Sequence, residues 1–268
     1  MLKRYAVMGH PVAHSLSPTI HQLFAEPLGI KLNYDKIAIE LLHFEQQVND
    51  FFQSGGKGLN ITLPCKERAF AMSDAPTARC SLAKAANTLW MSEGRLHADN
   101  TDGIGFLRDI EHHLSLQGLT ILILGAGGAT RGLLGPLIAA NPALVQLANR
   151  TLPRAQALQA DFPSLDIVPW EKLKDIPPPG LIINATSAGL DAQALHLPPS
   201  LFTRRAFCYD LAYRQSEPTT FVQQAWDLTC PAVDGLGMLV EQAAEAFYLW
   251  HGILPQTKPV LEQLRKYK

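Results

Sequence analysis

The sequence predicts an α/β protein of two α/β domains, the second a Rossmann-type doubly wound parallel sheet. Three observations predict this class. Short apolar runs alternate with helix-like segments, a glycine-rich turn directly follows the apolar run at 120–124, and the later segments are joined by short loops. The chain has 268 residues, which suggests roughly one or two domains of ~100–200 residues.

Composition excludes several classes of protein. Hydrophobic residues make up 47% of the chain, enough for a sizeable core, and the net charge of −1 predicts no nucleic-acid or acidic-membrane surface. None of the four cysteines has C-x-x-C spacing, so we expect neither a zinc site nor a disulfide framework, and a cytoplasmic location fits best. The start MLKRYAVMG lacks the apolar region of a signal peptide, and no stretch is typical of a membrane span.

The first hundred residues alternate between strand-like and helix-like patterns. Strands are predicted at 4–9, 32–40 and 58–63, and helices at 17–29, 42–55 and 64–72. Ser17 is predicted as the N-cap of the first helix, with Pro18 in its first turn. Residues 87–101 are predicted to form a hairpin that turns at Glu93-Gly94.

A helix over 102–114 is predicted to connect this half to a second series of strands. We expect these strands at 120–125, 144–150, 180–186, 207–213 and 231–235. A strongly periodic helix over 238–254 and the segment 258–268 follow. A boundary is expected near residue 101, but periodicity does not tell whether the last helices return to the first domain.

The glycine-rich turn predicts a dinucleotide site. Gly125, Gly127 and Gly128 follow a buried strand and open a helix, so backbone N–H groups can approach a pyrophosphate at the helix start. Thr130 occupies the third glycine position of the usual G-x-G-x-x-G pattern, so the match is imperfect. An ordinary strand–helix turn is the alternative, but the next strand lies at the spacing that a βαβ unit requires.

The segment after the next strand selects the cofactor. An NAD site carries an Asp or Glu there to bind the ribose hydroxyls, whereas this chain has Asn149, Arg150, Thr151 and Arg154. Two guanidinium groups and a hydroxyl suit the 2′-phosphate of NADP. The alternative explanation is that the arginines only solvate the start of a helix.

Polar residues at strand ends and helix starts predict a second site in the first half. These residues are Ser15, Ser17, Asn60, Thr62, Lys66, Asn87, Asp99, Asn100 and Asp102. Each alone has a simpler explanation: a capping serine, an asparagine in a turn, a surface lysine. Together they describe a pocket for a small polyhydroxylated acid. His10, His14 and His21 have no partner at ligand spacing, so no metal site is expected.

Seven motifs carry a resemblance that covers nearly the whole chain. They are GHPVAHSLSP, GLNITLPCK, NTDGIGF, GAGGATRG, NRT, NATSAG and DGLGMLVEQAA, in that order. In this order they resemble the shikimate dehydrogenase family. The resemblance implies reversible NADP-dependent reduction of 3-dehydroshikimate to shikimate in the pathway to chorismate and the aromatic amino acids. It implies a small-molecule substrate, no nucleic-acid or membrane partner, and a monomer or homodimer.

The resemblance also implies roles for individual residues. Lys66 and Asp102 would form the catalytic pair. The substrate-binding residues would be Ser15, Ser17, Asn60, Thr62, Asn87, Tyr213 and Gln242. The cofactor-binding residues would be Gly125, Ala126, Gly127, Gly128, Ala129, Asn149, Arg150, Thr151, Arg154, Leu211, Gly235 and Met238.

The implied domains are a substrate-binding domain of residues 1–101 with 237–268, and an NADP-binding domain of residues 102–236. Hydride transfer needs the nicotinamide within roughly 3–3.5 Å of the carbonyl carbon. We therefore expect an active-site cleft between the domains. His10, Lys84 and Leu190 depart from the family's usual Asn, Gly and Met.

Three other functions fit parts of the sequence. An NAD-using quinate/shikimate dehydrogenase paralogue should carry an acidic residue after the second strand, where Thr151-Leu152 stands. A regulatory NADP-binding protein without catalysis would need neither Lys66 nor Asp102. A folate-linked dehydrogenase of similar architecture lacks support in the motifs of the first half.

Overall fold

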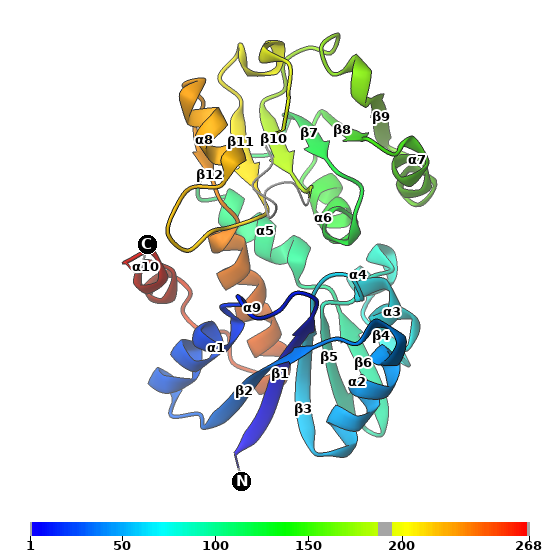
Figure 1. The fold of residues 1–268 in the computed structure, drawn as a ribbon, viewed down its shortest axis with the longest axis vertical. Coiled ribbons are helices and arrows are strands. Elements are labelled where there is room, and N and C mark those ends of the chain that lie inside the picture. The colour runs from blue at the N-terminus through cyan, green and yellow to red at the C-terminus, as the bar shows by residue number, and fades with distance from the viewer. Residues whose placement is uncertain (1, 187–194, 267–268) are drawn as a thin grey trace. The chain divides into compact units, whose positions relative to one another are not determined.

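A computed structural model describes residues 2–186 and 195–266, in two compact units (Figure 1). The first unit contains residues 1–106 and 239–263, and the second contains residues 107–238 and 264–268. The predicted α/β class is confirmed, because each unit is built on its own sheet. Assigning substrate to one unit and cofactor to the other stays a prediction. Leu190 and the end of the NATSAG motif lie outside the described residues.

The first unit is a mixed sheet with helices. Its strands follow the order β2-β1-β3-β5-β6-β4. The elements are β1 Lys3–Gly9, α1 Ser17–Ala25, β2 Leu32–Ala38, α2 Phe44–Gln53, β3 Gly56–Ile61, α3 Lys66–Ala71, β4 Ala75–Pro76, α4 Ala78–Ala83, β5 Thr88–Ser92 and β6 Arg95–Asp99. The predicted hairpin is β5–β6, and Glu93 and Gly94 turn it with φ of 51° and 73°. Both residues lie in the left-handed region that two-residue hairpin turns favour.

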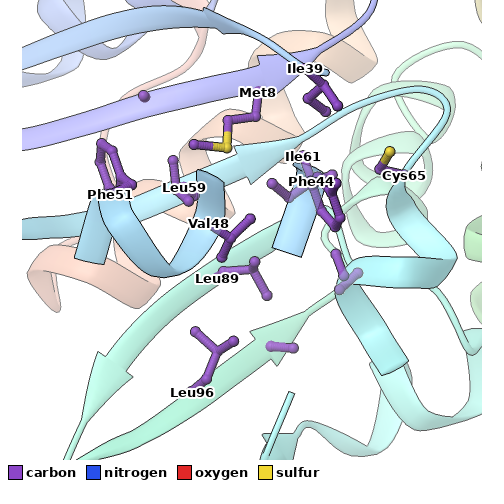
Figure 2. Packing of buried hydrophobic residues seen from close by; sticks show 14 of the residues in the cluster. Met8, Ile39, Phe44, Val48, Phe51, Leu59, Ile61, Cys65, Leu89 and Leu96 are labelled. Atoms are coloured by element: carbon purple, nitrogen blue, oxygen red, sulfur yellow. The ribbon is translucent and has the colours of Figure 1, made fainter. Parts of the chain in front are cut away.

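Helix α2 packs its apolar side against the sheet of the first unit. Phe44, Val48 and Phe51 repeat at helical spacing and are buried. Figure 2 shows them facing buried residues of the strands, among them Met8 and Leu59. Burying each such side chain stabilises the fold by roughly 1.5–3 kcal/mol. This core holds β1 and β3 in place; Asn60 lies in β3, Thr62 directly follows it, and Ser15 and Ser17 come after β1.

A fully buried histidine lies within an aromatic cluster of the first unit. His21, on α1, stacks on Tyr34 with ring centroids 4.5 Å apart, and Trp250 lies 5.3 Å away. Burial lowers the pKa of His21 to about 3. The folded protein therefore holds this imidazole neutral at pH values where it becomes protonated in the unfolded chain.

Replacing His21 with phenylalanine is expected to flatten the acid dependence of stability. Because the pKa is lowered on folding, the stability linked to His21 is complete above pH ~6.5 and is lost as the pH falls toward 3. Between pH 7 and 5 the loss is about 2 kcal/mol, and His21→Phe should not show it. Urea titrations at both pH values measure this, with exposed His112→Phe as control. An equal pH dependence in wild type and His21→Phe would contradict the assignment.

The second unit is a parallel sheet with strand order β12-β11-β10-β7-β8-β9. Its elements are β7 Thr120–Leu124, α6 Gly128–Ala139, β8 Leu144–Asn149, α7 Leu152–Asp161, β9 Leu165–Pro169, β10 Leu181–Asn184, β11 Phe207–Asp210, α8 Thr220–Asp227 and β12 Ala232–Val233. Three more helices lie only partly in this unit: α5 Asp102–Ile110, α9 Leu236–His251 and α10 Lys258–Lys266. The chain runs from β7 to β9 on one side and from β10 to β12 on the other. This is the Rossmann order, so the predicted doubly wound sheet is confirmed.

The strand order places a switch point between β7 and β10, the usual location of a ligand in such sheets. Helices α5, α9 and α10 each contain residues of both units. From Leu239 onward α9 belongs to the first unit. None of the described helices has the length and apolar composition needed to cross a membrane.

Candidate functional site

The predicted catalytic pair lies in the first unit as a short ion pair. Lys66 is the first residue of α3 and Asp102 the first of α5. The Lys66 Nζ donates a hydrogen bond to the Asp102 Oδ2 at 2.5 Å, and the two side chains are 12% and 6% exposed. The ammonium is therefore held in one place, on a side chain that is largely but not fully buried. The backbone N–H of Asp102 donates to the Asn100 Oδ1 at 3.1 Å, which fixes the start of α5.

Asn87 joins this pair to α9. Its Nδ2 lies 2.8 Å from the Asp102 Oδ1, 2.9 Å from the Thr101 Oγ1 and 3.3 Å from the Gln242 Oε1. The Asn87 Oδ1 accepts from the backbone N–H of Thr101 at 2.9 Å. The Asn87 side chain is therefore the centre of a network in which Lys66, Asp102 and Gln242 meet.

A glycine lets α9 approach this network. A Cβ on Gly105 would lie 2.6 Å from the backbone nitrogen and from the Cβ of Gln242. Any larger residue at 105 would push against the segment that carries Gln242. Sequence reasoning missed Gly105 and Thr101 as site residues. The signal was present in NTDGIGF, where small and polar residues stand at the start of a helix.

Asn60 and Tyr34 extend the polar cluster beneath Asn87. The Asn60 Nδ2 donates to the backbone oxygen of Asn87 at 3.2 Å and to the Thr88 Oγ1 at 3.1 Å. The Asn60 Oδ1 accepts from the Tyr34 Oη at 2.6 Å. Burial raises the pKa of Tyr34 above its ordinary value, so its hydroxyl stays a donor. Thr62 lies beside Gly9, because a Cβ on Gly9 would be 2.1 Å from the Thr62 methyl group.

Ser15 and Ser17 form a pair at the start of α1. The Ser15 Oγ donates to the Ser17 Oγ at 3.1 Å and accepts from the backbone N–H of Ser17 at 3.2 Å. The prediction that Ser17 caps α1 is wrong: Leu16 is the N-cap residue and Ser17 the first helical residue. The reason is that the Ser17 hydroxyl pairs with Ser15 instead of with the N–H groups of the helix.

One departure from the family pattern has a clear conformation. Lys84 follows the last residue of α4 and lies in the left-handed region, with φ of 49° and ψ of 33°. A non-glycine residue there costs roughly 1–2 kcal/mol. His10 is exposed, and its backbone N–H donates to the Leu63 oxygen at 2.9 Å.

The glycine-rich turn of the second unit connects β7 to α6. Gly125 has a φ of 104°, and a Cβ there would lie 2.9 Å from the Ala185 oxygen, so only glycine fits. Gly127 is the N-cap of α6. Apart from its two chain neighbours, no described residue has an atom within 4 Å of a Cβ placed on Gly127, so this helix start is open. Its first N–H groups have no partner within the helix and suit a pyrophosphate.

Thr130 explains why the third glycine is dispensable. Its hydroxyl donates to the Gly125 oxygen at 2.7 Å, and its side chain is fully buried. A hydrogen bond between helix and turn thus stands where a third glycine gives close packing in other turns of this type.

The residues after β8 are arranged for an anion. The Asn149 Oδ1 accepts from the Ala126 N–H at 3.2 Å, which ties this segment to the glycine-rich turn. Arg150, Thr151 and Arg154 are exposed, and α7 has no acidic residue in its first turn. Within the described part of the chain, neither guanidinium has a hydrogen bond or ion pair. Such free cations fit a phosphate group.

The remaining predicted cofactor residues lie near the ends of β11 and β12. A Cβ on Gly235 would be 2.3 Å from the Leu211 oxygen, so these residues touch through their backbones. Met238 is buried in the first turn of α9, and Tyr213 follows Leu211 in the same segment. Tyr213 therefore belongs to the second unit, unlike the other predicted substrate residues.

Asp210 is a buried carboxyl group that sequence reasoning missed. It accepts from the Asn184 Nδ2 at 3.0 Å, the Ala212 N–H at 3.1 Å and the Thr219 Oγ1 at 2.6 Å. Burial raises the pKa of Asp210 to about 6. Its bonds shape the segment that carries Leu211 and Tyr213. Polar residues ending two buried strands, Asn184 and Asp210, were the signal.

Comparison with known proteins identifies the family. The family model described as the shikimate dehydrogenase substrate binding domain matches residues 7–89, and the shikimate 5'-dehydrogenase C-terminal domain matches 235–265. A protein of Legionella pneumophila (strain Lens), named shikimate dehydrogenase (NADP(+)), is 54% identical over all of both chains.

Solved structures of similar proteins support the same family assignment. An Ael1 enzyme from Pseudomonas putida has a TM-score of 0.90 at 44% identity and covers 98% of each chain. The shikimate 5-dehydrogenase of Thermus thermophilus, in complex with NADP(H) and shikimate, has a TM-score of 0.89 at 38% identity over 100% of each chain. The chain therefore belongs to the shikimate dehydrogenase family.

Proposed function

We propose that this protein catalyses the reversible NADP-dependent reduction of 3-dehydroshikimate to shikimate, a step toward chorismate and the aromatic amino acids. The observation that carries the proposal is the Lys66–Asp102 ion pair at 2.5 Å, joined through Asn87 to Gln242. An ammonium paired with one carboxylate, beside a network of amide and hydroxyl groups around Asn87, suits a hydroxylated ketone. The names of the relatives support the same activity.

The first unit would bind the substrate and the second the cofactor. Substrate contacts would come from Ser15, Ser17, Asn60, Thr62, Asn87 and Gln242, with Tyr213 from the second unit. The pyrophosphate of NADP would lie at the start of α6, and its 2′-phosphate at Arg150, Thr151 and Arg154. When bound, the reduced form of the cofactor would supply the hydride for reduction, and the oxidised form would accept it in the reverse direction.

Lys66 would handle the proton. Reduction of a ketone places negative charge on its oxygen, and the ammonium can stabilise that charge and donate a proton to it. In the reverse direction the neutral amine accepts the proton of the hydroxyl group. Asp102 orients the ammonium through one oxygen, and its other oxygen is held by the Asn87 amide.

A steady-state assay with four reactant pairs tests this function. Shikimate and quinate are each offered with NADP and with NAD, and absorbance of the reduced cofactor is followed. We expect shikimate with NADP to give the highest kcat/KM. Preference for NAD would indicate the quinate/shikimate paralogue, which the free arginines and the absent acidic residue disfavour. No turnover with any pair would contradict catalysis.

The location and assembly of the protein complete the proposal. We expect a cytoplasmic enzyme that acts as a monomer or homodimer on a small-molecule substrate.

A further inference from the structure

Outside the proposed contacts, one arginine links two of the elements that carry them. Arg79 lies on α4 and its guanidinium is bidentate to Asp99, with Nε–Oδ1 at 2.8 Å and Nη2–Oδ2 at 2.6 Å. The same Nη2 donates to the Glu245 Oε1 at 2.8 Å. The carboxylates come from the end of β6 and from α9, so Arg79 joins three elements of the first unit.

Both partners of Arg79 stand next to proposed site residues. Asp99 precedes Asp102 by three residues, and Glu245 follows Gln242 by three residues, one turn along α9. Through Asp99, Arg79 is therefore connected to the proposed catalytic carboxylate of Asp102. Through Glu245, it is connected to Gln242, whose amide is proposed to bind the substrate.

The connection from Asp99 to Asp102 is a chain of hydrogen bonds. The Asp99 Oδ1 accepts from the Asn100 N–H at 2.7 Å and from the Thr77 Oγ1 at 2.6 Å. Asn100 in turn accepts the N–H of Asp102 at 3.1 Å, and its Nδ2 donates to the Ala85 oxygen at 2.8 Å. The carboxylate of Asp99 thus sets the turn from which Asp102 starts α5.

Burial makes this link specific. Asp99 is 1% exposed and Glu245 10%, while Arg79 is 30% exposed. The planar guanidinium of arginine can donate hydrogen bonds to both buried carboxylates at once. The single ammonium of a lysine cannot reproduce this geometry. We propose that Arg79 is a positioning residue, which holds the Asp102 turn and the Gln242 segment of α9 in register through Asp99 and Glu245. This inference rests on the proposed function.

Arg79→Lys tests the inference, because it keeps the positive charge and removes the planar guanidinium that makes the bidentate contact. We expect kcat with shikimate to fall and KM for shikimate to rise, each about tenfold, since small misplacements of reacting groups cost up to about 10²-fold. KM for NADP should stay within about twofold of wild type, because the proposed phosphate contacts lie in the second unit. The control is Arg4→Lys, at a half-exposed first-unit arginine whose Nε lies 3.7 Å from the Asp35 Oδ2, which should change no constant.

Two further variants separate positioning from folding. Glu245→Ala leaves the Arg79–Asp99 pair in place, so it should raise KM for shikimate more than it lowers kcat. In a Gln242→Ala background Arg79→Lys should raise that KM less than it does in wild type, because the residue it positions is absent.

Three results would overturn the inference while the parent enzyme turns over shikimate. They are unchanged constants in Arg79→Lys, a KM for NADP that rises as much as the KM for shikimate, and full additivity with Gln242→Ala. A parent protein that does not turn over shikimate would overturn the proposed function, and this inference with it.

Discussion

Lys66→Ala is expected to lower kcat for shikimate oxidation by about three powers of ten, with little change in KM. General acid–base catalysis contributes typically 10²–10⁴-fold, and charge stabilisation at the same oxygen adds to it. KM should change little because the neutral donors around Asn87 and Gln242 remain. Stopped-flow or steady-state measurement of the reduced cofactor gives both constants.

A control and a rescue make the Lys66 result specific. Lys57→Ala removes an exposed lysine of β3 and should leave kcat unchanged. Added methylamine should restore part of the activity of Lys66→Ala, because it can occupy the space beside Asp102 and supply an ammonium. If Lys66→Ala kept near-normal turnover, Lys66 would have no part in the chemistry.

Arg150→Ala is expected to raise KM for NADP by about 10–100-fold, because a hydrogen bond to a charged group contributes about 1.5–3 kcal/mol. KM for shikimate and all constants with NAD should stay near those of the parent, since NAD lacks the 2′-phosphate. Arg154→Ala should act in the same direction, because Arg154 lies in the first turn of α7. Measuring kcat/KM for both cofactors gives the change in preference directly.

The matched control is Arg204→Ala. Arg204 is an exposed arginine of the second unit that precedes β11, at the amino ends of the strands rather than the carboxyl ends. It should leave the preference for NADP unchanged. Equal loss with NAD and NADP in Arg150→Ala would contradict the phosphate assignment and favour a role in folding.

The second unit was the easier half to predict from the sequence. Its strands are buried apolar runs, and the turn at Gly125 and the helix start at Leu152 lie where local residue types require them. Strand β9 was not predicted, because Leu165–Pro169 is short and only partly buried. In the first unit β4 and α4 were missed for the same reason of length.

The candidate site was predictable only in part. The roles of Lys66 and Asp102 came from the family resemblance, since the two are 36 residues apart and no local pattern pairs them. The contact of Arg79 with Glu245 spans 166 residues, and only the folded chain reveals it. The Ser17 error has the opposite cause: the local capping signal was present, but the neighbouring Ser15 hydroxyl competed for the same oxygen.

The position of the free arginines has an evolutionary consequence. Arg150, Thr151 and Arg154 sit on one exposed stretch after β8, and none of them takes part in the hydrogen bonds around Lys66. Substitutions in that stretch can therefore change whether a related protein uses NADPH or NADH, while the reduction of the ketone at Lys66 is unaffected. Natural selection can thus change the cofactor preference independently of the catalytic residues, through substitutions at a few exposed positions.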